Sequence, residues 1–160
     1  MADAISNTSP LLYLHRVGIL DWLPQMFDSV WVPEAVVREL EAGRDGGYDV
    51  PVAVDHPWLS IVNPKITPVH WLALDLGPGE LGAMALALEH PSRVVLLDDL
   101  LARRTAAAAG LQVWGTLRVL LEGKGRGLVA DVAPLIDRLA EAGLWISPDV
   151  RQRILNLAGE

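Results

Sequence analysis

The sequence contains no cysteine among its 160 residues. Disulfide bonds, cysteine-ligated metal sites and a cysteine nucleophile are therefore excluded. No uninterrupted apolar run approaches the roughly 18 residues that predict a membrane-spanning helix, and the first residues lack the basic and apolar stretches of a signal peptide. These absences predict a cytoplasmic protein without a membrane partner.

An excess of positive charge is also missing. Thirteen lysines and arginines stand against 20 aspartates and glutamates, which gives a net charge of −7. The basic footprint of a dedicated nucleic-acid-binding protein is therefore absent from the molecule as a whole. Residues 93–126, however, hold six basic side chains against three acidic ones, so a local contact with nucleic acid stays open.

Two phosphate-binding patterns are absent as well. No G-x-G-x-x-G is present, and no G-K-[ST] follows a glycine-rich loop, so nucleotide-binding loops of these kinds are excluded. The four histidines show no metal-ligand spacing, which leaves oxygen-bearing side chains as the candidate ligands.

Short apolar segments alternate with helical patterns along the chain. Strands are expected at residues 4–6, 30–32, 94–97 and 112–114, and the β-branched run at 94–97 is typical of a central parallel strand. Helices are expected between them, one of them after a Ser9-Pro10 start with serine as the cap, and two more close the chain. Residues 41–68 are rich in glycine and proline and predict loops around short pieces of structure. The pattern predicts an α/β fold with a mostly parallel sheet flanked by helices, in one domain over residues 1–160.

Polar residues follow two of the predicted strands. Asn7-Thr8-Ser9 comes after the first strand, and Asp98-Asp99 comes after the central one. Glu39 and Glu80 lie on helices whose other faces are apolar. Each has a simpler explanation: Asp98 or Asp99 could cap a helix, Glu80 could favour a helix dipole, Glu39 could be a solvated charge, and 7–9 could be only a turn with a cap.

Taken together, these residues are more informative than any one of them. Ligands of open parallel sheets collect beyond the carboxyl ends of the strands, where carboxylates repel one another unless cations hold them together. Oxygen-only ligands suit Mg²⁺ or Mn²⁺. Such a cluster is suited to the hydrolysis of phosphodiesters, in which a metal activates water and offsets the developing charge.

Short motifs in a characteristic order extend this interpretation over nearly the whole chain, from Ile5 to Glu160. They are Ser6-Asn7-Thr8-Ser9-Pro10-Leu11, Val32-Pro33-Glu34-Ala35-Val36 with Glu39, Gly79-Glu80, Leu97-Asp98-Asp99 with Ala102-Arg103, Gly115-Thr116-Leu117 with Leu120-Leu121, Gly127-Leu128 and Ala158-Gly159-Glu160. In these motifs the chain resembles the PIN-domain proteins, and in particular a bacterial and archaeal branch described as predicted nucleic-acid-binding.

The resemblance implies a three-layer α/β fold and a nuclease that depends on Mg²⁺ or Mn²⁺. It implies that Glu39, Glu80 and either Asp98 or Asp99 bind the metal, while Asn7 stands where the family usually has aspartate. An amide oxygen is a weaker ligand than a carboxylate for a hard cation, so weakened activity is expected. The residues expected to contact the substrate are Thr8, Ser9, Arg103 and Thr116.

The function expected from these observations is metal-dependent hydrolysis of RNA by an endonuclease, with the toxin of a type II toxin–antitoxin pair as one form of it, as in the VapC-like relatives. The alternative is a nonenzymatic PIN-like module that binds nucleic acid or protein. A third class is an oligomer built through the apolar surface and the six tryptophans. The expected partners are RNA, an antitoxin protein and a second copy of the chain in a homodimer.

Overall fold

A five-stranded sheet forms the centre of the molecule in a computed structural model that describes residues 1–160. All neighbouring strands pair in parallel, in the order β3-β2-β1-β4-β5. The strands are β1 (Ala2–Ser6), β2 (Phe27–Val32), β3 (Leu59–Ile61), β4 (Val94–Leu96) and β5 (Val113–Trp114).

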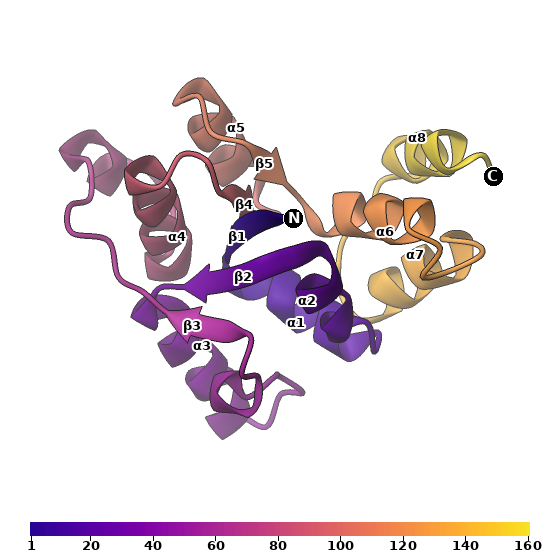
Figure 1. Cartoon of the computed structure of the whole chain (residues 1–160), viewed down its shortest axis with the longest axis horizontal. Helices are drawn as coiled ribbons and strands as arrows, with labels where there is room; N and C mark the ends of the chain where they lie inside the picture. Colours follow the sequence, from indigo (N-terminus) through magenta and orange to yellow (C-terminus); the bar gives the residue numbers. More distant parts are fainter.

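Helices fill the connections between the strands and the carboxyl-terminal third of the chain (Figure 1). They are α1 (Thr8–Arg16), α2 (Leu23–Met26), α3 (Glu34–Asp45), α4 (Pro78–Glu89), α5 (Leu100–Ala108), α6 (Thr116–Gly125), α7 (Ala133–Glu141) and α8 (Pro148–Ala158). Three short 3₁₀ helices complete the set at Leu20–Trp22, Ala53–Asp55 and Val69–Ala73. No helix combines the length and the apolar character that are needed to cross a bilayer.

Alternation along the strands divides the core into two layers. In β1, Ala4 belongs to a large apolar cluster on one face of the sheet, whereas Ile5 belongs to a smaller cluster on the other. Side chains of α1, α2, α3, α6, α7 and α8 fill the larger cluster, and those of α4 and α5 fill the smaller one. The period of two in a strand thus gives helices on both faces, which is the predicted three-layer α/β fold.

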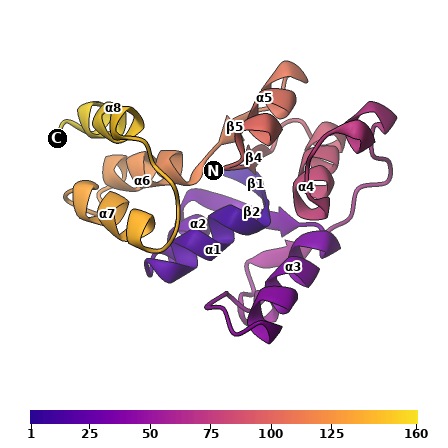
Figure 2. The same ribbon diagram turned by 180° about the vertical axis from the view of Figure 1, so that it is seen from behind.

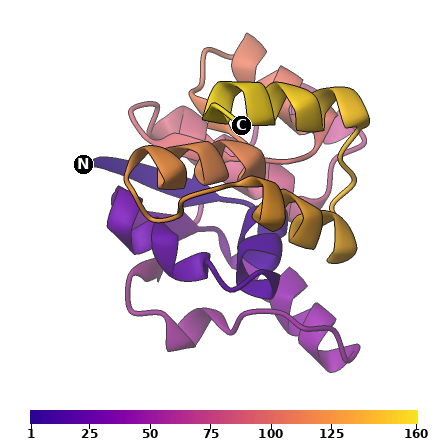
Figure 3. The same ribbon diagram turned by 90° about the vertical axis from the view of Figure 1, so that its right-hand side faces the viewer.

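The last three helices lie at the end of the molecule opposite α3 and α4 (Figures 1 and 2). Figure 3 looks onto them and shows α8, in yellow, beside α6, in orange. The Glu160 carboxylate joins the ends of this group: it accepts hydrogen bonds from Lys124 Nζ at 2.8 Å and from the backbone N–H groups of Val132 and Ala133 at 2.8 and 3.1 Å. The side chain of the last residue therefore holds α6, α7 and α8 together.

One prediction about local structure is wrong, and the structure makes another more specific. The first helix begins at Thr8 with Asn7 at the cap position, not at Ser9, because the Ser9 hydroxyl is bonded to Asp98 instead of to the start of the helix. Residues 41–68, expected to be loops around short pieces, contribute one such piece as the edge strand β3. That strand has three residues and pairs only with β2, too short a segment for a clear alternating pattern.

Parallel pairing brings the carboxyl ends of the strands to one edge of the sheet. The segment after β1 therefore lies beside the segments after β4 and β5, although about 90 residues of sequence separate the first from the second. Helices α3 and α4 lie side by side near this edge, as both Figure 1 and Figure 2 show.

Candidate functional site

Asn7 lies directly beyond the end of β1 with 3% of its surface exposed. Its backbone N–H donates to the carbonyl of Leu96 at 3.1 Å, which continues the pairing of β1 with β4. It occupies the cap position of α1, yet its side chain makes no capping hydrogen bond, and its Oδ1 is buried without a partner. A buried amide oxygen without a donor costs free energy, which a group bound to this atom would recover.

Glu39 projects from α3 into the same place. Its Oε1 accepts a hydrogen bond from the Thr8 hydroxyl at 2.6 Å, and its Oε2 accepts one from the backbone N–H of Gly79 at 3.0 Å. The carboxylate therefore connects three elements, the starts of α1 and α4 and the middle of α3. Hydrogen bonds therefore hold the Glu39 carboxylate in place. The alternative explanation, a solvated charge on the surface, does not describe it.

Gly79 is a part of this site that the motif analysis did not single out as functional. A Cβ at this position would overlap the Glu39 carboxylate and would lie 2.9 Å from Asn7 Oδ1. The glycine lets the start of α4 approach both side chains, and its N–H holds Glu39. The signal in the sequence is a second glycine, after Gly77, in the first turn of a helix, where most other residues would favour the helix more.

Glu80 lies in the first turn of α4, and its side chain reaches back to the cap residue Gly77. Its Oε2 accepts a hydrogen bond from the N–H of Gly77 at 3.0 Å. Burial raises the pKa of the Glu80 carboxyl, the Gly77 bond opposes this, and the negative charges of Asp99, Glu39 and, less strongly, Asp75 raise it further. The repulsion shows that Glu80 shares a negative field with the acids of α3 and of the β4–α5 link.

Asp98 follows β4 and is held by three donors. Its Oδ1 accepts from the N–H of Thr116 at 2.8 Å, and its Oδ2 accepts from the hydroxyls of Thr116 at 2.7 Å and Ser9 at 2.9 Å. These bonds tie the end of β4 to the starts of α1 and α6. The hydroxyls of Ser9 and Thr116, expected to contact a substrate, act in this structure on the aspartate between them.

Asp99 has a different environment from its neighbour. It caps α5, with Oδ2 accepting from the N–H of Ala102 at 2.9 Å. The simple capping explanation thus describes Asp99, while Asp98 serves as a link between helices. Asp99 is also the acid whose charge acts most strongly on Glu80. Its Oδ1 makes no hydrogen bond within the chain, so one oxygen of this carboxylate remains without a partner.

The tertiary structure thus brings the predicted residues to one edge of the sheet in two connected groups. The first contains Asn7, Thr8 and Glu39 against the start of α4, and the second contains Ser9, Asp98 and Thr116 at the ends of β4 and β5. The negative charge of Asp99, at the cap of α5, repels that of Glu80, in the first turn of α4. Arg103, also predicted, lies on α5 close to Gly115, and it forms no ion pair with any of these acids.

The donor set suits a hard divalent cation in its chemistry. The available atoms are all oxygens, and Asn7 Oδ1 is an orphaned acceptor next to the Glu39 carboxylate. No three histidine, aspartate or glutamate side chains, however, have the arrangement of a ready-made metal site. The residues therefore fit a cation held by Asn7, Glu39, Glu80 and Asp99 only in part, with an amide in place of one carboxylate.

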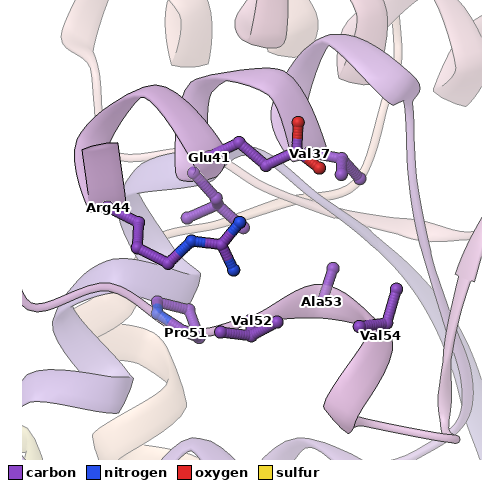
Figure 4. A pocket seen from close by; sticks show the side chains of 8 residues that line it. Val37, Glu41, Arg44, Pro51, Val52, Ala53 and Val54 are labelled. Carbon is purple, nitrogen blue, oxygen red and sulfur yellow. The ribbon is translucent and has the colours of Figure 1, made fainter. Parts of the chain in front are cut away.

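A small pocket elsewhere on the molecule does not belong to this site. It measures ≈ 80 Å³ and lies between α3 and the segment 51–54 (Figure 4). Val37, Glu41 and Arg44 line it from the helix, and Pro51 and Val52 lie opposite. None of the site residues lines it, because Glu39 projects from another face of α3.

Comparisons with known proteins give a matching family model and a similar solved structure. The family model described as DUF3368: PIN domain matches residues 3–160. Among solved structures, a PilT N-terminus domain protein from the hyperthermophilic archaeon Sulfolobus solfataricus P2 is similar, with 14% identity, a TM-score of 0.47, and coverage of 92% of this chain and 98% of that one. No curated protein sequence matches the chain.

The fold and the site define an α/β protein with an oxygen-rich cluster at the carboxyl edge of a parallel sheet. The chain belongs to the PIN-domain family, because the family model covers all but its first two residues. The resemblance seen in the sequence motifs is thereby confirmed.

Proposed function

We propose that the protein is a metal-dependent ribonuclease that cleaves phosphodiester bonds of single-stranded RNA at this edge of the sheet, with low activity in its present sequence. The observation that carries the proposal is the buried, unpartnered Oδ1 of Asn7 beside the Glu39 carboxylate. An oxygen in that position lacks a donor within the chain and is satisfied by a cation. Membership of the PIN-domain family supports the same activity.

The residues of the chain divide the work. Asn7, Glu39, Glu80 and Asp99 would hold the cation, and Thr8 and Gly79 fix the orientation of Glu39 before it binds. A bound Mg²⁺ or Mn²⁺ supplies an activated water and offsets the charge that develops on the phosphate. Asp98 holds the ends of β4 and β5 at a fixed distance from α1, which keeps the two halves of the site in register.

The amide at position 7 sets the expected level of activity. Replacing a carboxylate by an amide removes one full charge from the cation's surroundings, while three acids remain. Two unit charges about 4 Å apart interact by roughly 1–4 kcal/mol in a half-exposed site, and a divalent cation doubles this. The site therefore binds metal weakly and retains slow cleavage.

The test compares the wild-type protein with Asn7→Asp and Glu39→Gln in a cleavage assay on a single-stranded RNA with Mn²⁺. Asn7→Asp is expected to tighten Mn²⁺ binding about tenfold, the equivalent of about 1.4 kcal/mol, and to raise the cleavage rate. Glu39→Gln is expected to lose both. Equal activity of the wild type and Asn7→Asp would remove position 7 from the metal site.

A second function is favoured by the same side chain. If the amide prevents productive metal binding, the protein is a nonenzymatic PIN-like module that binds RNA or a protein such as an antitoxin. The absence of three suitably arranged acids favours this alternative. This alternative would be established if the wild type and Asn7→Asp both bound RNA and neither cleaved it in the presence of Mn²⁺.

A further inference from the structure

Arg103 occupies a protected position beside the acidic cluster. It projects from α5 and is half-buried, and its Nη1 donates only a long hydrogen bond, 3.5 Å, to the carbonyl of Leu97. Its Cζ lies 3.4 Å from the point where a Cβ on Gly115 would be, and the Nη1 would overlap that Cβ. The guanidinium therefore rests directly on the backbone of Gly115, in space that exists because this residue has no side chain.

The position that a Gly115 Cβ would occupy also locates Arg103 relative to the site. Asp98 Oδ1 lies 3.3 Å from the position of that absent Cβ, so the aspartate and the guanidinium flank Gly115 together. Asp98 is already satisfied by Ser9 and Thr116 and forms no ion pair with the arginine. Arg103 thus stands next to a group of acids without being neutralised by any of them.

The donors of Arg103 are largely unused. A guanidinium has five N–H donors in a planar fork, and the structure gives this one a single weak partner. Some other arginines of the chain pair with carboxylates, as Arg118 does with Glu122 at 3.2 Å and Arg151 with Asp137 at 3.1 Å. A half-buried fork with free donors at the rim of an anionic site matches a phosphate group, which two of its N–H groups can bind at once.

We propose that Arg103, placed against Gly115, binds a backbone phosphate of the RNA and positions the RNA strand over the carboxylate cluster. The inference rests on the proposed ribonuclease function. It adds the group that overcomes the repulsion between the acids and an anionic substrate, since Glu39, Glu80, Asp98 and Asp99 otherwise oppose its approach.

The experiment measures binding of a fluorescent single-stranded RNA by anisotropy, in EDTA to prevent cleavage, over a range of salt concentrations. Arg103→Ala is expected to weaken binding about 10–100-fold, the loss of a charge-assisted hydrogen bond. The slope of log affinity against log salt is expected to fall by about 0.7, one phosphate contact on a single strand. Arg103→Lys is expected to restore the slope but only part of the affinity.

Two further variants separate a contact with phosphate from a structural role. Gly115→Ala keeps every charge but displaces the guanidinium, so it is expected to weaken binding as Arg103→Ala does. Arg104→Ala, its exposed neighbour on α5, removes the same charge from a position away from Gly115 and is expected to change affinity less than about threefold. If Arg103 only stabilised the end of β4, Arg103→Ala would lower the melting temperature and leave the salt slope unchanged.

The outcomes also separate this inference from the proposed function. RNA binding that depends on Arg103, in a protein without Mn²⁺-dependent cleavage, would support the inference and overturn the nuclease. Cleavage by the wild type with unchanged RNA binding and salt slope in Arg103→Ala would overturn the inference alone. A wild-type protein that does not bind single-stranded RNA in EDTA would overturn the inference as well.

Discussion

At the scale of one residue, Glu80 shows that the carboxylates of the site repel one another. Its carboxyl is partly buried among other acids, and its pKa lies above its ordinary value of 4.5. The folded protein therefore binds this proton more tightly than the unfolded chain does. The corresponding stability is fully present below pH 4.5 and is lost as the pH rises through the raised pKa of the folded state.

The first prediction follows from that sign. Without metal, Glu80→Gln is expected to raise the melting temperature at pH 7, because it removes the repelled charge and keeps an oxygen for the N–H of Gly77. The difference from wild type should vanish near pH 4. Thermal unfolding followed by circular dichroism over pH 4–8 measures both.

Added Mn²⁺ provides the control for this prediction. It should stabilise the wild type more than Glu80→Gln, because the ion binds the carboxylate that the variant lacks. A variant that is less stable than wild type at pH 7 without metal would show that burial and repulsion do not govern Glu80.

The adjacent aspartates give the second prediction. Asp98 is bonded by three donors from two other elements, so Asp98→Asn is expected to cost about 1–3 kcal/mol of stability. Asp99→Asn keeps a good helix cap, so its stability should change by less than about 0.5 kcal/mol, while Mn²⁺ binding weakens. Urea denaturation and calorimetry with Mn²⁺ distinguish them, and the reverse pattern would make Asp98 the ligand.

At the scale of elements, α6 contacts the rest of the molecule through a glycine. A Cβ at Gly123 would overlap the ring of Trp22, whose Cη2 would lie 2.9 Å away. Helix α6 can approach the 3₁₀ turn Leu20–Trp22 this closely only because position 123 has no side chain. Trp22 belongs to the larger apolar cluster, so the contact lies at the edge of the core.

The third prediction tests that contact. Gly123→Ala is expected to lower stability by about 1–3 kcal/mol, because the added methyl group overpacks the core. Gly125→Ala in the same helix is the matched control, since no heavy atom lies within 4 Å of its Cβ, and it should be neutral or stabilising by up to about 1 kcal/mol. Denaturant titration measures both, and equal effects at the two positions would contradict the packing explanation.

At the scale of the whole molecule, exposed apolar side chains distinguish one region. Ile66, Val69 and Leu72 are 76%, 80% and 62% exposed, and they lie close together in the sequence before α4. The mean hydropathy of the chain is +0.30. Apolar side chains gathered on a surface often mark an interface between proteins.

The fourth prediction is that the protein forms a homodimer through this region. Light scattering at micromolar concentration should give about twice the 17.3 kDa mass of the chain, and Val69→Glu with Leu72→Glu should reduce it to the monomer. Val54→Glu changes an equally exposed valine, 83% exposed, in another part of the molecule and should leave the dimer intact. A monomeric wild type would count against the homodimer expected from the sequence.

Much of this architecture could be predicted from local patterns in the sequence. The run at 94–97 and the segment at 30–32 are apolar and β-branched, and they form the buried strands β4 and β2 because only a sheet covered on both faces can bury such segments. Gly110 and Ser147 mark helix ends in the places where the structure has them, because left-handed backbone and side-chain capping are local effects. Local physics therefore determined the fold class and most of the elements.

The arrangement of the site was decided by the tertiary structure. The sequence showed that Asn7, Glu39, Glu80 and Asp98-Asp99 follow strands or lie on amphipathic helices. It could not show that the Asn7 amide is left without a donor, or that Asp98 is bonded by Ser9, because the contacts that build the site join residues as far as 89 positions apart. The same reason applies to three glycines, Gly79, Gly115 and Gly123. The need for a glycine at each position can be explained only once the tertiary structure shows which group occupies the space of the absent side chain.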